Sequence, residues 1–227
     1  LKPPLEVRAA VNKNRQYPIS ERDYPFDVAV VMEYIYGDSV KQAIEEKLNR
    51  KTKVNDPDEY QTAACFAYWL FSTLEKLHKR DIVHRDIKPD NIIMCQSEFF
   101  LVDFGYSCST DPDVEYRCRR FDIGSPMYLE LNLLENGKTT IDYVKGNDVW
   151  SAAVTIYEFC HPKMMYAGDD VEGLIEFIKD YSYQFDESEW TELGQIMNDA
   201  LTLDRDQRPT AESIRTRLES VILPYRN

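Results

Sequence analysis

Two stretches decide the fold of this chain: HRDIKPDN at residues 84–91 and VDFG at residues 102–105. Two apolar runs, residues 92–94 and 99–102, lie between and beside them. A pair of such runs joined by a few polar residues predicts an antiparallel β-hairpin. We therefore expect a hairpin that holds a cluster of charged and amide side chains.

The polar residues of this cluster have the chemistry of phosphoryl transfer. Mg²⁺ prefers hard oxygen ligands, so the Asn91 amide and the Asp103 carboxylate would bind it together with phosphate oxygens. Asp86 would accept the proton of an attacking hydroxyl, and Lys88 would neutralise charge on the phosphoryl group. The alternative interpretation is a chance charged turn in an unrelated domain.

The two motifs, in this order and at this separation, resemble the catalytic core of a eukaryotic-type protein kinase. The position of Lys88 resembles the serine/threonine class. The resemblance implies a mainly helical α+β fold, in which residues 36–227 form the helical large (C-terminal) lobe with the catalytic loop and the activation segment. Residues 1–35 would form a remnant of the small-lobe sheet and the hinge. It also implies ATP and Mg²⁺ as cofactors, and a protein substrate whose hydroxyl receives the γ-phosphate.

The resemblance extends to the nucleotide site, because residues 28–37 look like the last small-lobe strand and the hinge. The adenine would bond to the backbone of Glu33 and Ile35, with Asp38 or Ser39 near the ribose. The residues implied to bind the nucleotide are Met32, Glu33, Ile35, Asp38, Ile93 and Asp103. An ordinary buried strand that leaves a sheet is the alternative.

The residues that precede Val28 contain neither a G-x-G-x-x-G motif nor a Val-Ala-x-Lys motif, and the chain begins with Leu1. A complete kinase carries a phosphate loop, a strand lysine and a helix glutamate in this region. We therefore expect weak or no ATP turnover from these 227 residues alone. Two interpretations stay open: an N-terminally truncated kinase, or a pseudokinase-like protein-interaction module. A small-molecule phosphotransferase is disfavoured, because residues 124–128 and Arg208 resemble the protein-kinase pattern.

Residues 105–132 show no clean periodicity and predict a long loop, which by resemblance is the activation segment. Arg85 immediately precedes the proposed base, where an arginine can pair with a phosphorylated loop residue. Our hypothesis is that Ser109 or Thr110 is such a regulatory site. An unmodified surface loop is the alternative.

The sequence GSPMY at residues 124–128 resembles the substrate-docking end of that segment. The family continues with Ala-Pro-Glu, whose glutamate pairs with a late arginine, whereas this chain has Glu130, Leu131 and Asn132. The candidate arginine is Arg208. Either Glu130 takes over the pairing or Asn132 offers a weaker, neutral hydrogen bond.

Helical periodicity predicts the remaining elements. The ranges are 40–48, 57–77, 146–159, 171–178, 187–201 and 209–222. Asp38 or Ser39 would cap the first helix, and Asp56 would cap the second. The stripe of the second helix, Ala63, Phe66, Ala67, Leu70, Leu74 and Leu77, is expected in the core.

Three single residues, Asp148, His84 and His78, also have expected roles. By resemblance, Asp148 would hold the 84–91 loop by accepting backbone N–H bonds, and His84 would pack under Phe104. His78 is expected to be an ordinary surface or packing residue.

The composition is that of a globular protein, with 43% apolar residues and a net charge of −13. This charge argues against a nucleic-acid partner, because phosphate contacts need a basic surface. No apolar run of membrane-spanning length and no signal-peptide core occurs, so we expect an intracellular, cytoplasmic protein without a membrane partner. The five cysteines are odd in number and form no CxxC pair, which predicts reduced thiols. Redox activity of Cys108 and Cys118, which flank a probable loop, is the alternative.

Overall fold

The computed structural model describes residues 34–49, 57–96, 98–113, 118, 124–137, 141, 143–162, 165–180 and 183–225. The chain divides into two units, residues 1–36 and 37–227. In the first unit the rings of Tyr34 and Tyr36 meet edge to face, with centroids 4.6 Å apart. The strand predicted at residues 28–32, the cap predicted at Asp56 and the nucleotide contacts predicted for Met32 and Glu33 lie outside the described residues.

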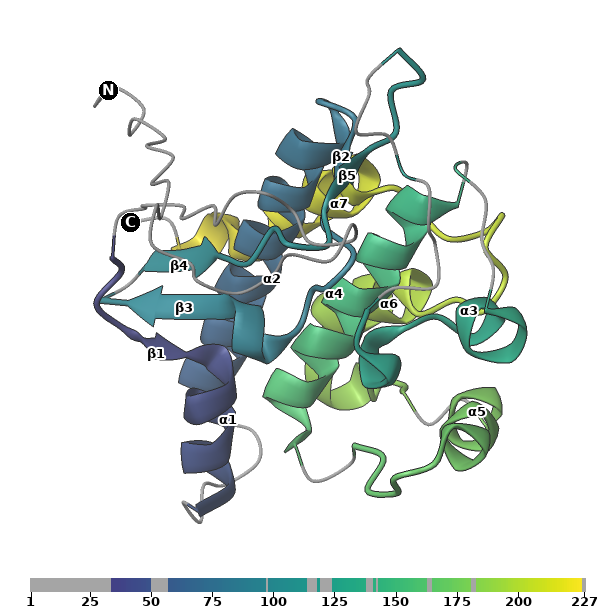
Figure 1. Cartoon of the computed structure of the whole chain (residues 1–227). Helices are drawn as coiled ribbons and strands as arrows, with labels where there is room; N and C mark the ends of the chain where they lie inside the picture. The colour runs from purple at the N-terminus through teal and green to yellow at the C-terminus, as the bar shows by residue number, and fades with distance from the viewer. Residues whose placement is uncertain are drawn as a thin grey trace, which may run out of the picture. The chain divides into compact units, whose positions relative to one another are not determined.

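The second unit contains the predicted hairpin. Strand β3 (Ile92–Cys95) pairs antiparallel with β4 (Glu98–Leu101), and β1 (Asp38–Ser39) pairs with the other edge of β3 (Figure 1). The Val102 N–H donates to the Asn91 carbonyl at 2.9 Å, which continues the ladder by one step. The hairpin therefore places Asn91 opposite the residue that precedes Asp103.

The entry to β1 requires a glycine. A Cβ atom on Gly37 would lie 2.0 Å from the carbonyl oxygen of Met94, so no other residue fits there without a shift of the backbone. Helix α1 (Val40–Asn49) follows β1 directly. Ser39 Oγ accepts from the Gln42 N–H at 3.2 Å, and Gln42 Oε1 accepts from the Ser39 N–H at 2.7 Å. This reciprocal cap selects Ser39 from the two predicted capping residues.

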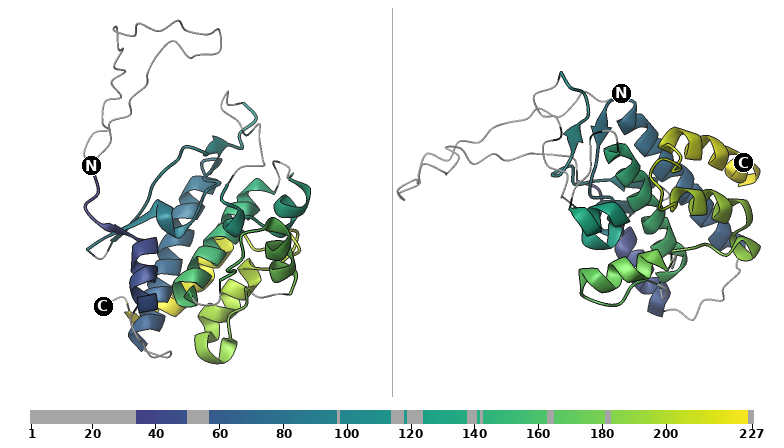
Figure 2. Two further views of the ribbon diagram at one scale, coloured as in Figure 1. Left: turned by 60° about the horizontal axis from the view of Figure 1, so that its bottom comes forward. Right: turned by 90° about the vertical axis from the view of Figure 1, so that its right-hand side faces the viewer.

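The core is helical, as the periodicity predicts. On α2 (Pro57–His78) five of the predicted stripe residues are fully buried, and Leu77 is partly buried against them. Helix α4 (Val144–Cys160) packs along one side of α2 and α7 (Ala211–Ile222) along another, as Figure 2 shows. The other helices are α3 (Leu131–Asn136), α5 (Val171–Lys179) and α6 (Glu187–Ala200), with short 3₁₀ turns η1 (Pro89–Asn91), η2 (Pro126–Tyr128) and η4 (Leu223–Tyr225).

Helix α4 is buried on all sides and carries several buried polar residues: Asn147, Asp148, Ser151, Thr155 and Glu158. Buried polar groups need partners, and most of these residues find them in the segments that surround the helix, whereas Thr155 donates to the Ser151 carbonyl within it. Ser151 donates to the Tyr128 carbonyl at 2.6 Å, and Glu158 accepts from the Tyr128 hydroxyl at 2.5 Å. The helix therefore fixes the surrounding loops by hydrogen bonds as well as by packing.

Two predictions for residues 105–132 are wrong. The region is not all loop, because β5 (Cys108–Ser109) pairs with β2 (Ile82–Val83), and α3 begins at Leu131. The cysteines are not all reduced, because Cys108 and Cys118 form a disulfide while Cys65, Cys95 and Cys160 are free. The physical reason is that the Cys118 N–H donates to the Ser109 carbonyl at 2.9 Å, so the two cysteines lie side by side.

Candidate active site

The carboxylate of Asp86 is the centre of the site. Its Oδ2 accepts from Asn91 Nδ2 at 2.9 Å and lies 3.0 Å from Lys88 Nζ. Asn91 Nδ2 also donates to the Asp86 carbonyl at 2.8 Å, which closes the loop on itself. The structure thus brings Asp86, Lys88 and Asn91 together around one carboxylate that is only 5% exposed.

A fourth residue, Ser125, belongs to this cluster and was given no role from the sequence. Its hydroxyl donates to Asp86 Oδ1 at 2.9 Å and accepts from Lys88 Nζ at 2.8 Å. These bonds join the 84–91 loop to the 124–128 segment. The signal available in the sequence was the GSPMY motif, which identifies the segment but not the partner of its serine.

The electrostatics of the cluster keep Asp86 ionised. Burial raises the pKa of Asp86, but the hydrogen bonds from Lys88 and Ser125 outweigh it and leave the pKa below its ordinary value. At neutral pH the site therefore presents a carboxylate that is held in place by three donors.

Asn91 and Asp103 supply two oxygen donors at the end of the hairpin. Asp103 is exposed and has a left-handed backbone with φ of 59°, and its Oδ1 accepts from the Gly105 N–H at 3.1 Å. The Asn91 nitrogen is used by Asp86, so its oxygen is the atom left for a cation. One carboxylate and one amide oxygen suit Mg²⁺, which keeps water and phosphate ligands. Within the described ranges, no group of three or more His, Cys, Asp or Glu residues is arranged to hold a metal.

The other residues predicted to bind the nucleotide are only partly placed. Asp38 and Ile93 lie on the neighbouring strands β1 and β3, where Ser39 pairs with Ile93 and Asp38 pairs with Met94. Ile35 belongs to the first unit, residues 1–36.

Asp148 anchors the 84–91 loop, which confirms the role expected from the resemblance. Its carboxylate is fully buried and accepts from the backbone N–H groups of His84 and Arg85, each at 2.8 Å. Arg85 has a φ of 68°, a left-handed conformation that is costly for a residue with a side chain. The two hydrogen bonds stabilise this turn and so determine where Asp86 lies.

Of the two roles expected for His78, surface or packing, the structure shows packing, with a specific partner that was not expected. Its Nε2 lies 3.1 Å from Asp148 Oδ2, and its side chain is only 10% exposed. The residue is therefore a third partner of the anchoring carboxylate. A lone histidine at the end of a helix carries no sequence signal for a partner that lies 70 residues later.

The packing expected for His84 is confirmed. Its ring meets that of Phe104 edge to face, with centroids 4.7 Å apart. Nε2 lies 3.1 Å from the Val102 carbonyl, and Nδ1 accepts from the Asp86 N–H at 3.4 Å. Burial lowers the pKa of His84, so the ring is neutral with its proton on Nε2. This tautomer ties the 84–91 loop to the residue before Asp103.

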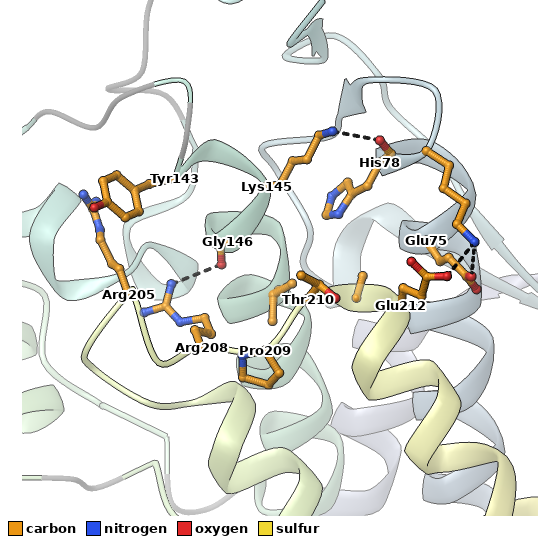
Figure 3. Close-up of a pocket in the computed structure, with 13 residues that line it drawn as sticks. Glu75, His78, Tyr143, Lys145, Gly146, Arg205, Arg208, Pro209, Thr210 and Glu212 are labelled. Atoms are coloured by element: carbon orange, nitrogen blue, oxygen red, sulfur yellow. Dashed lines mark hydrogen bonds and ion pairs between the residues drawn. The ribbon is translucent and has the colours of Figure 1, made fainter.

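Glu130 takes over the pairing of the missing Ala-Pro-Glu glutamate. Its buried carboxylate lies 2.7 Å from Arg208 Nη1 and also pairs with Arg205. The Asn147 amide nitrogen, in the orientation that satisfies the network, donates to Glu130 at 2.5 Å. Asn132, the alternative, is exposed. Arg208 also donates to the Gly146 carbonyl at 3.1 Å, the bond drawn in Figure 3.

A cavity of about 350 Å³ lies where the end of α2 meets the starts of α4 and α7 (Figure 3). Charged side chains line it, but each is engaged in ion pairs or hydrogen bonds with neighbouring residues. Lys79 pairs with Glu75 and Glu212, and Lys145 donates to the His78 carbonyl at 2.9 Å. The cavity is thus bounded by structural ion pairs. His78 lines it and also contacts Asp148, the residue that anchors the 84–91 loop.

The residues predicted to be regulatory lie on both sides of the β2–β5 pair. Arg85 Nε donates to the Tyr106 carbonyl at 2.5 Å. Ser109 is the second residue of β5. The Thr110 hydroxyl donates to Asp81 Oδ1 at 3.1 Å, the same carboxylate oxygen that Lys145 contacts at 2.7 Å. Regulation by phosphorylation at Ser109 or Thr110 stays a prediction.

Comparison with known proteins identifies the family to which the chain belongs. The family model described as protein kinase domain matches residues 19–217. A serine/threonine-protein kinase of Drosophila persimilis is 27% identical over 227 residues, covering 92% of this chain and 28% of the relative. The ovarian-specific serine/threonine-protein kinase Lok of Drosophila melanogaster is 24% identical over 220 residues, covering 91% of this chain and 44% of the relative.

A probable serine/threonine-protein kinase of Dictyostelium discoideum is 34% identical over 131 residues, covering 57% of this chain and 16% of the relative. The chain thus spans less than half the length of these three relatives. In the part of the chain that the structure describes, no helix has both the length and the apolarity needed to cross a membrane. The mainly helical fold with small antiparallel sheets agrees with the family match, which covers most of the sequence. The chain therefore belongs to the protein kinase family.

Proposed function

We propose that this chain is the catalytic part of a serine/threonine protein kinase, which transfers the γ-phosphate of ATP to a hydroxyl group of a protein. One observation carries the proposal: Asp86 is a buried, ionised carboxylate with Asn91, Lys88 and Ser125 all within 3.0 Å. The printed names of the relatives, which are serine/threonine-protein kinases, support the same class.

Asp86 is the proposed base, and its main task is to orient the acceptor hydroxyl. Its Oδ1 already accepts a hydrogen bond from the Ser125 hydroxyl at 2.9 Å, so the carboxylate faces a hydroxyl donor. A base of this kind contributes by position as much as by proton transfer. The Asp148 hydrogen bonds to the preceding backbone supply that position.

Lys88, Asn91 and Asp103 are proposed to act on the phosphate side. The Lys88 ammonium would offset negative charge on the phosphoryl group, and the oxygens of Asn91 and Asp103 would hold Mg²⁺. When bound, Mg²⁺-ATP supplies the phosphoryl group that is transferred. Met32, Glu33, Ile35, Asp38 and Ile93 are proposed to contact the nucleotide.

A pseudokinase-like interaction module is the second candidate. The observation that favours it is the sequence Glu130, Leu131 and Asn132 where the family has Ala-Pro-Glu. The complete set of Asp86, Lys88, Asn91 and Asp103 favours the enzyme, because a module that acts only by contact has no use for all four.

The test is a phosphate-transfer assay with radiolabelled ATP and two peptides that differ only in a serine or tyrosine acceptor. We expect weak, Mg²⁺-dependent label in the serine peptide, because residues 1–27 carry neither a phosphate-loop motif nor a strand-lysine motif. Asp103→Asn should remove it, whereas Asp169→Asn, a change at an exposed carboxylate before α5, should retain it. Label in the tyrosine peptide would contradict the class. A folded protein that neither transfers label nor binds Mg²⁺-ATP would favour the interaction module.

A further inference from the structure

The disulfide between Cys108 and Cys118 lies beside the 84–91 loop. Cys108 pairs with Val83 in the β2–β5 ladder, and the Cys118 N–H donates to the Ser109 carbonyl at 2.9 Å. The ladder itself is only two residue pairs long. A two-stranded ladder of this length is marginal in water by itself, so the covalent bond adds a restraint that the ladder needs.

The disulfide packs on residues that lead directly to the catalytic cluster. Cys118, Val83 and Val144 form a small buried apolar cluster, with Cys108 packed against it. Val83 immediately precedes His84. Val144 lies four residues before Asp148 on α4, so both are on one face of that helix. The apolar cluster therefore holds the backbone at Val83, and the Asp148 carboxylate holds it at the next two residues, His84 and Arg85.

A second connection runs from the end of β5 to the same region. The Thr110 N–H donates to the Asp81 carbonyl at 2.7 Å, and the Asp81 carboxylate binds Lys145. Lys145 in turn donates to the His78 carbonyl, as Figure 3 shows. Release of β5 would thus remove contacts at residue 81 and at the turn that begins with Val83.

We propose that the Cys108–Cys118 disulfide is a reversible redox switch: oxidised, it fixes β5 against the 84–91 loop, and reduced by a dithiol, it releases β5. Cys108 is half-exposed whereas Cys118 is 8% exposed, so the Cys108 sulfur is the accessible point of attack. A thiolate of the reductant attacks it, forms a mixed disulfide and displaces the Cys118 thiolate.

The second thiol of the reductant then displaces Cys108 and closes the reductant's own disulfide. Two electrons and two protons pass from the dithiol to the two cysteines, which leaves two thiols in the chain. The inference rests on how the disulfide is packed and is independent of phosphate transfer.

The test compares amide hydrogen exchange of the air-oxidised protein with and without dithiothreitol, and peptide mapping verifies the disulfide. Upon reduction we expect exchange about tenfold faster or more at the amides of Thr110, Cys118 and Arg85. Amides in the middle of α2 should keep their rates. Unchanged exchange at Thr110 and Arg85 would overturn the proposal, as would an oxidised protein without the Cys108–Cys118 link. Faster exchange throughout α2 would also overturn it, because the bond would then be a global structural element.

Two variants separate this bond from other thiol effects. Cys108→Ser should show the fast exchange without any reductant. Cys95→Ser, a change at a half-exposed free cysteine, should respond to dithiothreitol like the unmodified protein. Slow exchange at Thr110 in Cys108→Ser, or loss of the response in Cys95→Ser, would contradict the assignment. Because exchange does not measure phosphate transfer, a protein that switches but neither transfers phosphate nor binds Mg²⁺-ATP would overturn only the proposed function.

Discussion

The Glu130 carboxylate lies 2.7 Å from the guanidinium of Arg208, and both side chains are almost fully buried. The pair joins the end of the 124–128 segment to the turn before α7, across 78 positions of sequence. Arg205 and Asn147 complete the hydrogen bonding of the carboxylate. The 124–128 segment is thus attached to the helical core although the family's Ala-Pro-Glu sequence is absent.

Removal of this carboxylate should be strongly destabilising. Glu130→Ala leaves Arg208 charged and buried without its partner, so we expect a loss of about 3–5 kcal/mol in the free energy of unfolding. Glu130→Gln, which retains an acceptor oxygen, should lose less. Urea denaturation measures both. Asn132→Ala, a change at the exposed position that aligns with the family glutamate, should alter stability by no more than about 0.5 kcal/mol. Equal losses of stability at positions 130 and 132 would contradict the assignment of Glu130 as the partner of Arg208.

Asp148→Asn should loosen the 84–91 loop. The carboxylate accepts from two backbone N–H groups and contacts His78, and an amide can replace only part of this pattern. Charge-assisted hydrogen bonds are worth about 1.5–3 kcal/mol each, so we expect a loss of at least about 2 kcal/mol. Hydrogen exchange should accelerate at the His84 and Arg85 amides. Unaltered protection of both amides would show that another group holds the loop.

The pH dependence of stability should report the state of Asp86. Burial raises its pKa, yet Lys88 and Ser125 lower it further, so the net pKa in the folded protein is below that of the unfolded chain. A depressed carboxyl pKa adds stability above the unfolded value of about 3.9, and this stability is lost as the pH falls through the folded pKa. The stability difference between the unmodified protein and Asp86→Asn should therefore shrink below about pH 4 in urea titrations. A stability difference that widens as the pH falls would show that the pKa of Asp86 is not depressed in the folded protein.

Ser125→Ala should reduce phosphate transfer without unfolding the protein. The hydroxyl links Asp86 and Lys88, so its removal leaves both side chains less restricted. A lost hydrogen bond of one to two kcal/mol corresponds to a decrease of about tenfold in kcat/KM. Ser125→Thr keeps the hydroxyl and should restore most of the rate. Equal rates in the alanine and threonine variants would show that the hydroxyl has no positioning role.

Much of the fold follows from local patterns in the sequence. The β3–β4 hairpin was predictable from two apolar runs separated by polar residues, and the α2 stripe from apolar residues that recur with helical spacing. The bond between Asp86 and Asn91 was predictable because both residues lie in one short loop, and the contact of Asp148 with that loop was predictable from the family resemblance.

The features that sequence reasoning missed depend on contacts between distant or irregular segments. The residue that pairs with Arg208 could not be chosen between Glu130 and Asn132, because the chain carries the acid two positions earlier than the family does. Nothing in the spacing of Cys108 and Cys118 shows that residue 118 returns to β5. The bond between His78 and Asp148 was likewise not predictable from the sequence, because it depends on how α2 and α4 pack.

The rate of phosphate transfer in Asp86→Asn tests the central claim most directly. The variant keeps the size of the side chain and a hydrogen-bond acceptor but removes the carboxylate that orients the acceptor hydroxyl. We predict a decrease in kcat of about 10²–10⁴-fold with Mg²⁺-ATP affinity essentially unchanged. An Asp86→Asn protein that transfers phosphate at the unmodified rate would contradict the account.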